Sequence, residues 1–174
     1  MTAFQTFTSG QILTAAQVTT LQANSTAVAI FEEHQTSGTA GGAATSAAWT
    51  KRTLNTTIVN GITACSIASS VITLTAGTYF VEAVSTFYRT DVNQLRLRNT
   101  TAGTNLVLGM TAFGSSGGVT AVNPYLKGYF TLTGSTNIEL QYYMSGASVS
   151  ANDQGVAGTW GTNVYSTLTI QQVA

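Results

Sequence analysis

The chain of 174 residues is the size of one domain, or of one domain with an arm. Only 7% of the residues are charged, and six Lys and Arg balance six Asp and Glu, whereas an average soluble domain is about 25% charged. This balance excludes the basic surface that binds nucleic acid or anionic membranes, so neither is expected as a partner. A chain with so little charge tends to associate, and we expect association to be its normal state.

Sequence features also bear on where the chain is made. No stretch approaches the roughly 20 apolar residues of a membrane span. The first residues, MTAFQTFTSG, lack the basic and apolar regions of a signal peptide. A single cysteine, Cys65, excludes a disulfide within one chain, and its apolar surroundings predict a buried thiol. We therefore expect synthesis in the cytoplasm without classical secretion.

Residues 1–27 differ in pattern from the rest and are expected to form an N-terminal attachment arm. Thr14 is followed three residues later by Gln17, which is the spacing of a capping box. Val18 and Leu21 then fall three residues apart on one face of a helix. The arm is therefore expected to contain one short helix of two or three turns.

Residues 28–174 have the pattern of a single all-β domain. Segments rich in Val, Ile, Thr and aromatic residues are separated by turn residues. The dipeptide Asn60-Gly61 predicts a hairpin, and the segment TSGTAGGAATSAA predicts a mobile loop. We expect a jelly-roll or related sandwich of about nine or ten antiparallel strands. The expected strands lie within 27–34, 49–59, 62–68, 70–77, 78–89, 93–99, 105–113, 124–134, 136–146 and 159–173.

The segment Leu74–Arg89 predicts one long strand with large apolar groups on both faces. One face would carry Tyr79, Val81, Ala83, Ser85 and Phe87, and the other Phe80, Glu82, Val84, Thr86 and Tyr88. A two-layer sandwich covers only one face of each sheet. A symmetric copy of the chain would cover the second face, although single aromatic residues are also tolerated on surfaces. The expected oligomer interface comprises Phe80, Val84, Tyr88 and Tyr143.

Several segments together resemble a known module. These are WTKRTLNTT, ITLTAGTYFVEAVSTFYRTDVNQLRLRNTT, YFTLTGSTNIELQYYMSG and YSTLTIQQV. Their pattern, from about Ile30 to Val173, resembles the jelly-roll head of complement and tumour-necrosis-factor-like modules, in the versions found in bacteriophage structural proteins. The segment FTSGQILTAAQVTTLQAN resembles the start of many phage tail and fibre proteins, except that Thr19 stands where Asn is often found. The resemblance implies a homotrimer around a threefold axis.

The resemblance also implies a place in a virion, on the capsid surface or the tail. The expected function is that of a capsid decoration or cement protein, or a short head fibre, that binds the major capsid protein or another virion protein. The arm would supply the contact, through Phe4, Phe7, Ile12, Leu13, Val18 and Leu21. The alternative is a tail-associated fibre module that recognises a host surface glycan or protein.

Groups suited to catalysis or metal binding are few. His34 is the only histidine and lies near Glu32, but no Gly-x-Ser-x-Gly elbow accompanies it. The six acidic residues are scattered and lack the spacing of metal ligands. We therefore expect no catalytic residue, no metal site, no cofactor and no enzymatic activity.

Cations next to aromatic residues are candidates for surface contacts. Trp49 with Lys51 and Arg52 suits a protein contact or carbohydrate stacking. Trp160, Tyr125 and Tyr143 are further aromatic candidates for such a surface. A second group of cations, formed by Arg89, Arg96 and Arg98, would either pair with Glu82 or Glu139 inside an oligomer or receive an anionic ligand.

Overall fold

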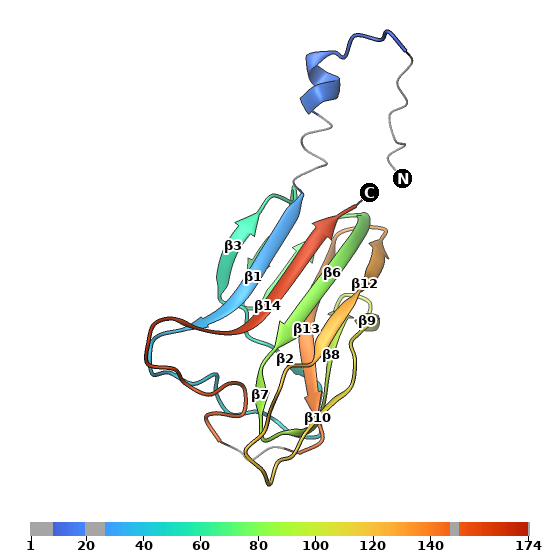
Figure 1. Ribbon diagram of the computed structural model, residues 1–174. Coiled ribbons are helices and arrows are strands. Elements are labelled where there is room, and N and C mark those ends of the chain that lie inside the picture. The colour runs from blue at the N-terminus through green and yellow to red at the C-terminus, as the bar shows by residue number, and fades with distance from the viewer. Residues whose placement is uncertain (1–8, 20–26, 147–149, 174) are drawn as a thin grey trace.

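The computed structural model describes residues 9–19, 27–146 and 150–173. Within these ranges there are fourteen strands: twelve form the two antiparallel sheets of a sandwich, and two form a separate ribbon (Figure 1). Residues 15–19 form a short helix before the sandwich. The sandwich begins with the first residue of β1, Val28. The expected all-β jelly roll is confirmed, and its strands outnumber the expected nine or ten because several expected strands are interrupted.

Five strands build the front sheet of Figure 1, and every neighbouring pair is antiparallel. Their order across the sheet is β12 (Tyr125–Leu132), β6 (Gly77–Ser85), β14 (Asn163–Gln172), β1 (Val28–Gln35) and β3 (Thr56–Asn60). The first and last strands of the domain, β1 and β14, therefore lie side by side. Their pairing joins the two ends of the domain in the middle of the front sheet.

Seven strands build the second sheet, and a two-stranded ribbon lies apart from both. The second sheet has the order β10 (Ala112–Gly114), β8 (Asp91–Asn99), β13 (Thr136–Met144), β5 (Val71–Leu74) and β4 (Ser66–Ala68), with β2 (Thr50–Lys51) paired to β13 and β9 (Thr104–Leu108) paired to β8. The ribbon joins β7 (Phe87–Tyr88) to β11 (Ala121–Val122).

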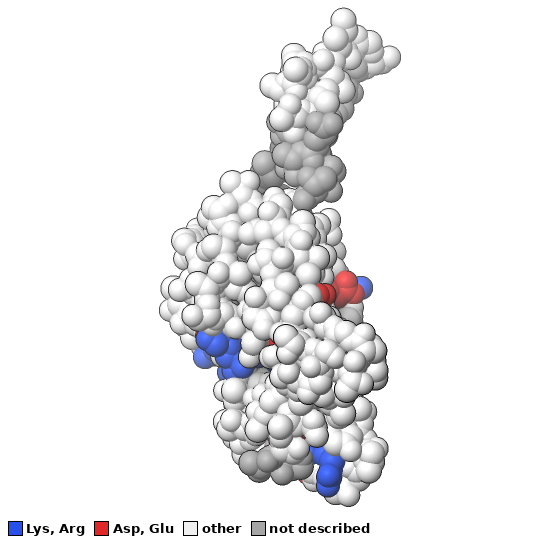
Figure 2. Space-filling view, turned by 90° about the vertical axis from the view of Figure 1, so that its left-hand side faces the viewer, with Lys and Arg blue, Asp and Glu red and all other residues white. Residues whose placement is uncertain are grey.

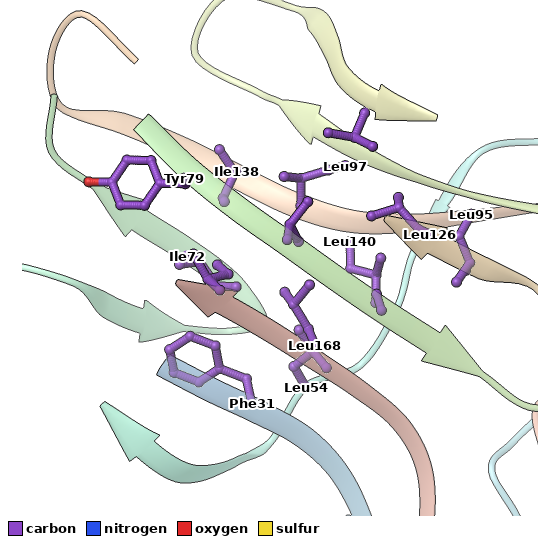
Figure 3. Packing of buried hydrophobic residues seen from close by; sticks show 14 of the residues in the cluster. Phe31, Leu54, Ile72, Tyr79, Leu95, Leu97, Leu126, Ile138, Leu140 and Leu168 are labelled. Atoms are coloured by element: carbon purple, nitrogen blue, oxygen red, sulfur yellow. The ribbon is translucent and has the colours of Figure 1, made fainter. Parts of the chain in front are cut away.

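The core lies between the two sheets. Figure 3 shows Phe31 and Leu168 from the front sheet with Leu97, Ile138 and Leu140 from the back sheet, all of them fully buried. Full burial of such a side chain contributes about 1.5–3 kcal/mol through the hydrophobic effect. Cys65 joins the same cluster, so the expected buried thiol is confirmed.

The two faces of the long β6 segment separate as its sequence predicts. The residues expected on one face are all buried, namely Tyr79, Val81, Ala83, Ser85 and Phe87. Those expected on the other face are exposed or half-buried, namely Phe80, Glu82, Val84, Thr86 and Tyr88. The segment is not one strand, however: β5 ends at Leu74 in the second sheet, and Thr86 separates β6 from β7.

The hairpin expected at Asn60-Gly61 is wrong. β3 pairs with β1, whereas β4 pairs with β5, so the chain crosses between sheets after Asn60. The Asn60 side chain instead donates a hydrogen bond to the carbonyl of Cys65 at 2.9 Å. The tight hairpin is the β4–β5 connection, where Ser69 and Ser70 both adopt positive φ, as a two-residue type I′ turn requires.

The loop expected to be mobile, between β1 and β2, is held by hydrogen bonds. Gly41 N and Gly42 N donate to the carbonyls of Gly155 and Ala151, at 3.0 and 2.8 Å. The Gln154 side chain donates to Ala43 O at 2.7 Å. The glycines here allow two loops to pack closely. The composition of a loop does not by itself distinguish close packing from mobility.

The capping box of the arm helix is confirmed. Gln17 N donates to the Thr14 hydroxyl at 3.3 Å, and Thr14 N donates to Gln17 Oε1 at 2.9 Å. These reciprocal bonds satisfy amide groups that the first turn of a helix leaves without partners.

Candidate interaction surfaces

The outer face of the front sheet carries a band of apolar side chains. The exposed members are Ile58, Val59, Val84, Tyr129 and Val164, and Tyr129 is 68% exposed. Phe80 and Tyr129 are cross-strand partners whose ring centroids lie 5.1 Å apart. The two rings form an aromatic pair on the open side of the sheet, where no element of the described chain covers Tyr129.

A small charged network lies within this apolar band. Lys127 lies 3.7 Å from the Glu82 carboxylate, and its ammonium lies 5.4 Å from the centroid of the Phe80 ring. Tyr125 donates its hydroxyl proton to Glu82, and this hydrogen bond raises the pKa of the tyrosine. The charges on the band are therefore paired with each other, which lowers the cost of covering them.

The expected interface residues divide between the two sheets. Phe80 and Val84 share the outer face of the front sheet, and Tyr88 lies in β7, just beyond the end of β6. Tyr143 lies in β13, in the second sheet, and its ring centroid is 5.5 Å from that of Trp49. In a cyclic trimer each interface joins two different surfaces of neighbouring copies, so residues of both sheets can belong to one interface. The interface of Phe80, Val84, Tyr88 and Tyr143 therefore stays a prediction, and its residues come from both sheets.

Trp49 and Tyr143 belong to a separate cluster on the second sheet. The Arg96 guanidinium lies 4.1 Å from the centroid of a Trp49 ring and donates two hydrogen bonds to Gln141 Oε1, at 2.9 and 2.7 Å. Gln141 donates to Glu139 at 2.7 Å. The cationic group of Arg96 is thus engaged by neighbours within the chain.

Arg89 and Arg98 also have partners within the chain. Arg89 Nε donates to the carbonyl of Ser116 at 3.3 Å, and Arg98 donates to Asn105 at 2.9 Å. The nearest opposite charge that Glu139 meets is Lys51, at 4.0 Å. Within one chain, no ion pair joins these three arginines to Glu82 or Glu139, and pairing inside an oligomer stays a prediction.

Arg52 is not a surface residue, which corrects its expected role beside Trp49 and Lys51 in contacting a ligand. Its side chain is fully buried, 2.8 Å from Glu33, and it donates to the carbonyls of Gln154 and Tyr165 at 2.9 and 3.2 Å. Lys51, its neighbour in sequence, stays exposed because successive strand residues point to opposite faces.

The expected arm contacts are partly described. Ile12, Leu13 and Val18 are exposed, and Ile12 is 90% exposed. Phe4, Phe7 and Leu21 lie outside the described residues. The described part of the arm therefore presents apolar groups that do not pack on the sandwich.

A groove of about 350 Å³ lies beside Trp160, where β6 ends and β14 begins. Trp160 is 89% exposed, and Thr86, Tyr88 and Thr162 line the groove with it. The sequence suggests Trp160 as a surface aromatic residue but not these neighbours, because they come from segments more than 70 residues apart. The one feature of the sequence that points to this groove is a tryptophan flanked by glycines, in GTWG.

The remaining candidates for chemistry are His34 and the acidic residues. His34 Nε2 lies 2.7 Å from the Glu32 carboxylate, on the outer face of the front sheet. Among the described residues, no three His, Cys, Asp or Glu side chains gather as metal ligands would. Within the same ranges the structure contains no helix with the length and apolarity needed to span a bilayer. Figure 2 shows that charged side chains are sparse on the face it presents.

Comparison with known proteins finds likeness only in structure. No protein-family model matches the chain, and no curated protein sequence matches it. The globular domain of the zebrafish complement 1qA protein superposes with a TM-score of 0.55 at 13% identity, covering 84% of this chain and 97% of that domain. Murine APRIL, solved at pH 8.0, superposes with a TM-score of 0.52 at 12% identity, covering 83% and 97%. At these identities the likeness shows the fold, which is that of complement and tumour-necrosis-factor-like jelly rolls.

Proposed function

We propose that this chain forms a homotrimer in which the outer face of the front sheet packs against neighbouring copies. The observation that carries the proposal is the exposed apolar band of that sheet, which includes Val84, Tyr129 and Val164. Large exposed apolar patches mark interaction sites, and closed symmetric assemblies are the usual arrangement of self-associating proteins. The choice of a trimer rests on the resemblance to complement-like modules, whose fold this chain shares.

We further propose that the trimer is a structural protein of a bacteriophage particle, made in the host cytoplasm and carried on the capsid surface as a decoration or cement protein, or as a short head fibre. The exposed Ile12, Leu13 and Val18 of the arm support this role. Three arms per trimer would bridge capsid subunits, and each would add about 25 cal/mol per Å² of buried apolar area before the cost of ordering. The role is structural, so no catalytic activity is proposed.

The experiment has two steps. Light scattering of the purified chain measures its mass, which should be three times 18.1 kDa. The protein is then mixed with phage heads that lack it, and co-sedimentation and heat resistance of the heads are measured. Stoichiometric binding with raised heat resistance is the expected result. A monomer in the first step would reject the trimer, and a trimer that leaves heads untouched would reject the capsid role.

A tail-associated receptor-binding module is the second candidate. The observation that favours it is the exposed Trp160, which lies just before β14, and β14 starts at the end of the front sheet opposite the start of β1. In this case the trimer would ignore phage heads and adhere to host cells. The same mixing experiment, run with cells, separates the two roles.

A further inference from the structure

The groove beside Trp160 has the composition of a ligand site. Its volume of about 350 Å³ falls within the range of roughly 300–1,000 Å³ that is usual for small-molecule sites. Aromatic and aliphatic side chains line it together with the hydroxyl groups of Thr86, Tyr88 and Thr162. We propose that this groove binds a neutral saccharide, with the Trp160 ring as the surface on which a sugar ring stacks.

The chemistry of the lining selects this class of ligand. A pyranose ring has an apolar face of C–H bonds and a rim of hydroxyl groups, and an indole ring offers a flat apolar surface of matching size. The described lining includes no Lys, Arg, Asp or Glu, so it lacks the charge-assisted donors that a phosphate or an acidic sugar requires. An uncharged polyhydroxy ligand fits this composition.

The hydroxyl groups in the groove are available to a ligand. Thr86, Tyr88 and Thr162 make no side-chain hydrogen bond within the described part of the chain, whereas nearby polar groups are engaged. The Tyr165 hydroxyl, for example, donates to the carbonyl of Thr39 at 2.8 Å. Each free hydroxyl can both donate and accept a hydrogen bond, which is the pattern that sugar hydroxyls match.

The Trp160 ring lies against the backbone of the loop beneath it and is otherwise exposed. A Cβ atom at Gly158 would lie 2.6 Å from the indole, so the ring rests directly on the glycine backbone. Asn163 fixes that backbone by accepting from Gly158 N at 2.9 Å and donating to Gly158 O at 3.1 Å. The backbone beneath the ring is therefore fixed, which reduces the loop freedom lost when a ligand binds.

The groove lies at the end of the domain that faces away from the arm. In the front sheet, Asn163 pairs with Gln35 at one end, and Gln171 pairs with Val28 at the other. At about 3.3 Å per strand residue, these ends are separated by roughly 26 Å. A saccharide bound beside Trp160 would therefore not obstruct a partner of the arm.

A second copy of this chain is the competing occupant, since Val164 belongs both to the groove and to the apolar band. The unpaired hydroxyl groups favour a saccharide over the apolar contact that a second copy would bring. The two occupants give different results when Trp160 is removed. Loss of saccharide binding with an unchanged mass indicates a ligand site, whereas loss of mass indicates a contact between copies.

Tryptophan fluorescence provides a direct test. The chain has two tryptophans, so the W49F variant leaves Trp160 as the only reporter. This variant is titrated with maltohexaose, cellohexaose and chitohexaose, and the wild type is applied to an array of neutral and acidic glycans. We expect a saturable shift of the emission to shorter wavelength with at least one neutral glycan. Binding to none of the neutral glycans, or to acidic glycans alone, would overturn the proposal.

Two variants complete the design. W160A should lose glycan binding by at least tenfold, measured by calorimetry, and should keep the mass of the wild type in light scattering. G158A keeps the indole but displaces it, and should weaken binding without abolishing the fold. Equal binding by W160A, or a lower mass, would reject the saccharide site. Neither result depends on whether the wild type binds phage heads, so the two proposals fail separately.

Discussion

Arg52 and Glu33 form an ion pair in the interior of the sandwich, with 2.8 Å between Arg52 Nη2 and Glu33 Oε2 and with the two side chains 0% and 1% exposed. The guanidinium also lies 5.2 Å from the centroid of the Phe87 ring and bonds to Gln154. This pair connects β1, the segment after β2 and the loop that packs against Gly41 and Gly42. Burial raises the pKa of Glu33, while the Arg52 charge opposes that shift.

Replacing Arg52 by Ala is expected to destabilise the domain by about 3–5 kcal/mol, because it leaves a buried carboxylate without its partner. The measurement is the free energy of unfolding from urea titration monitored by circular dichroism. K51A is the matched control, since Lys51 is next in sequence but exposed. Its cost should stay below about 1 kcal/mol. A similar cost for both variants would contradict the importance of the pair.

The same pair predicts non-additive behaviour. The double variant E33Q/R52Q should lose less stability than the sum of E33Q and R52Q, because neither charge is then left alone in the interior. Additive losses would show that the two side chains act independently, contrary to the geometry.

Cys65 gives the chain a dependence of stability on alkaline pH. Burial raises the pKa of its thiol from 9.0 to about 11. The unfolded chain therefore releases the proton first as pH rises, so this contribution to stability is complete below about pH 9 and is lost as pH approaches 11. At pH 11 the loss should be of order 1–3 kcal/mol. The measurement is urea unfolding between pH 8 and 11.

C65A is the control for this dependence, since other groups also titrate in the same range. Burial likewise raises the pKa of Tyr165, and both proteins share that effect. Above pH 9 the free energy of unfolding should fall more steeply for the wild type than for C65A. Parallel curves across the whole range would mean that the folded and unfolded thiols titrate alike.

Local pattern predicts the faces of the strands well but not the contacts between distant segments. Tyr79 and Phe80 point to opposite faces because side chains alternate along a strand, and this alternation can be recognised from neighbouring residues alone. The partner of Arg52 depends on which strands lie opposite each other. Sequence therefore suggests a surface cation beside Trp49, and only the packing of the sheets reveals a buried one.

Glycine-rich loops show the same limit. A Cβ atom at Gly41 would lie 2.2 Å from the carbonyl oxygen of Gln154, so this glycine permits two loops to touch. The contact joins positions more than 110 residues apart in the chain. The Trp160 groove likewise collects Thr86, which follows β6, with residues of β7, β11 and the start of β14. The tryptophan can therefore be recognised in the sequence, whereas the groove cannot.

A charge placed on the apolar band should separate the copies. In Y129E a carboxylate would have to be buried at the proposed trimer contact, and burial of an unpaired charge is costly. We expect light scattering at micromolar concentration to give 18.1 kDa instead of three times that mass. F113E is the matched control, because Phe113 is 70% exposed, close to the 68% of Tyr129, and lies in the second sheet. If F113E dissociates the trimer and Y129E does not, the interface lies on the second sheet instead.

Deleting residues 1–20 should abolish attachment to particles while leaving the trimer intact. The described arm residues Ile12, Leu13 and Val18 are exposed, so their removal takes no packing from the sandwich. The mass should remain that of a trimer of the shortened chain, and the midpoint of thermal unfolding should not change. Burial of two apolar side chains at roughly 1.5 kcal/mol each corresponds to about a hundredfold in affinity, so co-sedimentation with heads should fall at least that far.

A single substitution tests whether the effect comes from apolar contact. I12D places a charge at the most exposed apolar position of the described arm and should weaken co-sedimentation in the same direction as the deletion. Q11A, at the preceding residue, should leave it nearly unchanged because it removes little apolar area. Both variants retain Thr14 and Gln17, so the capping box of the helix is preserved. Stoichiometric binding by the shortened trimer would indicate that the sandwich, and not the arm, carries the attachment site. Equal effects of I12D and Q11A would argue against an apolar contact.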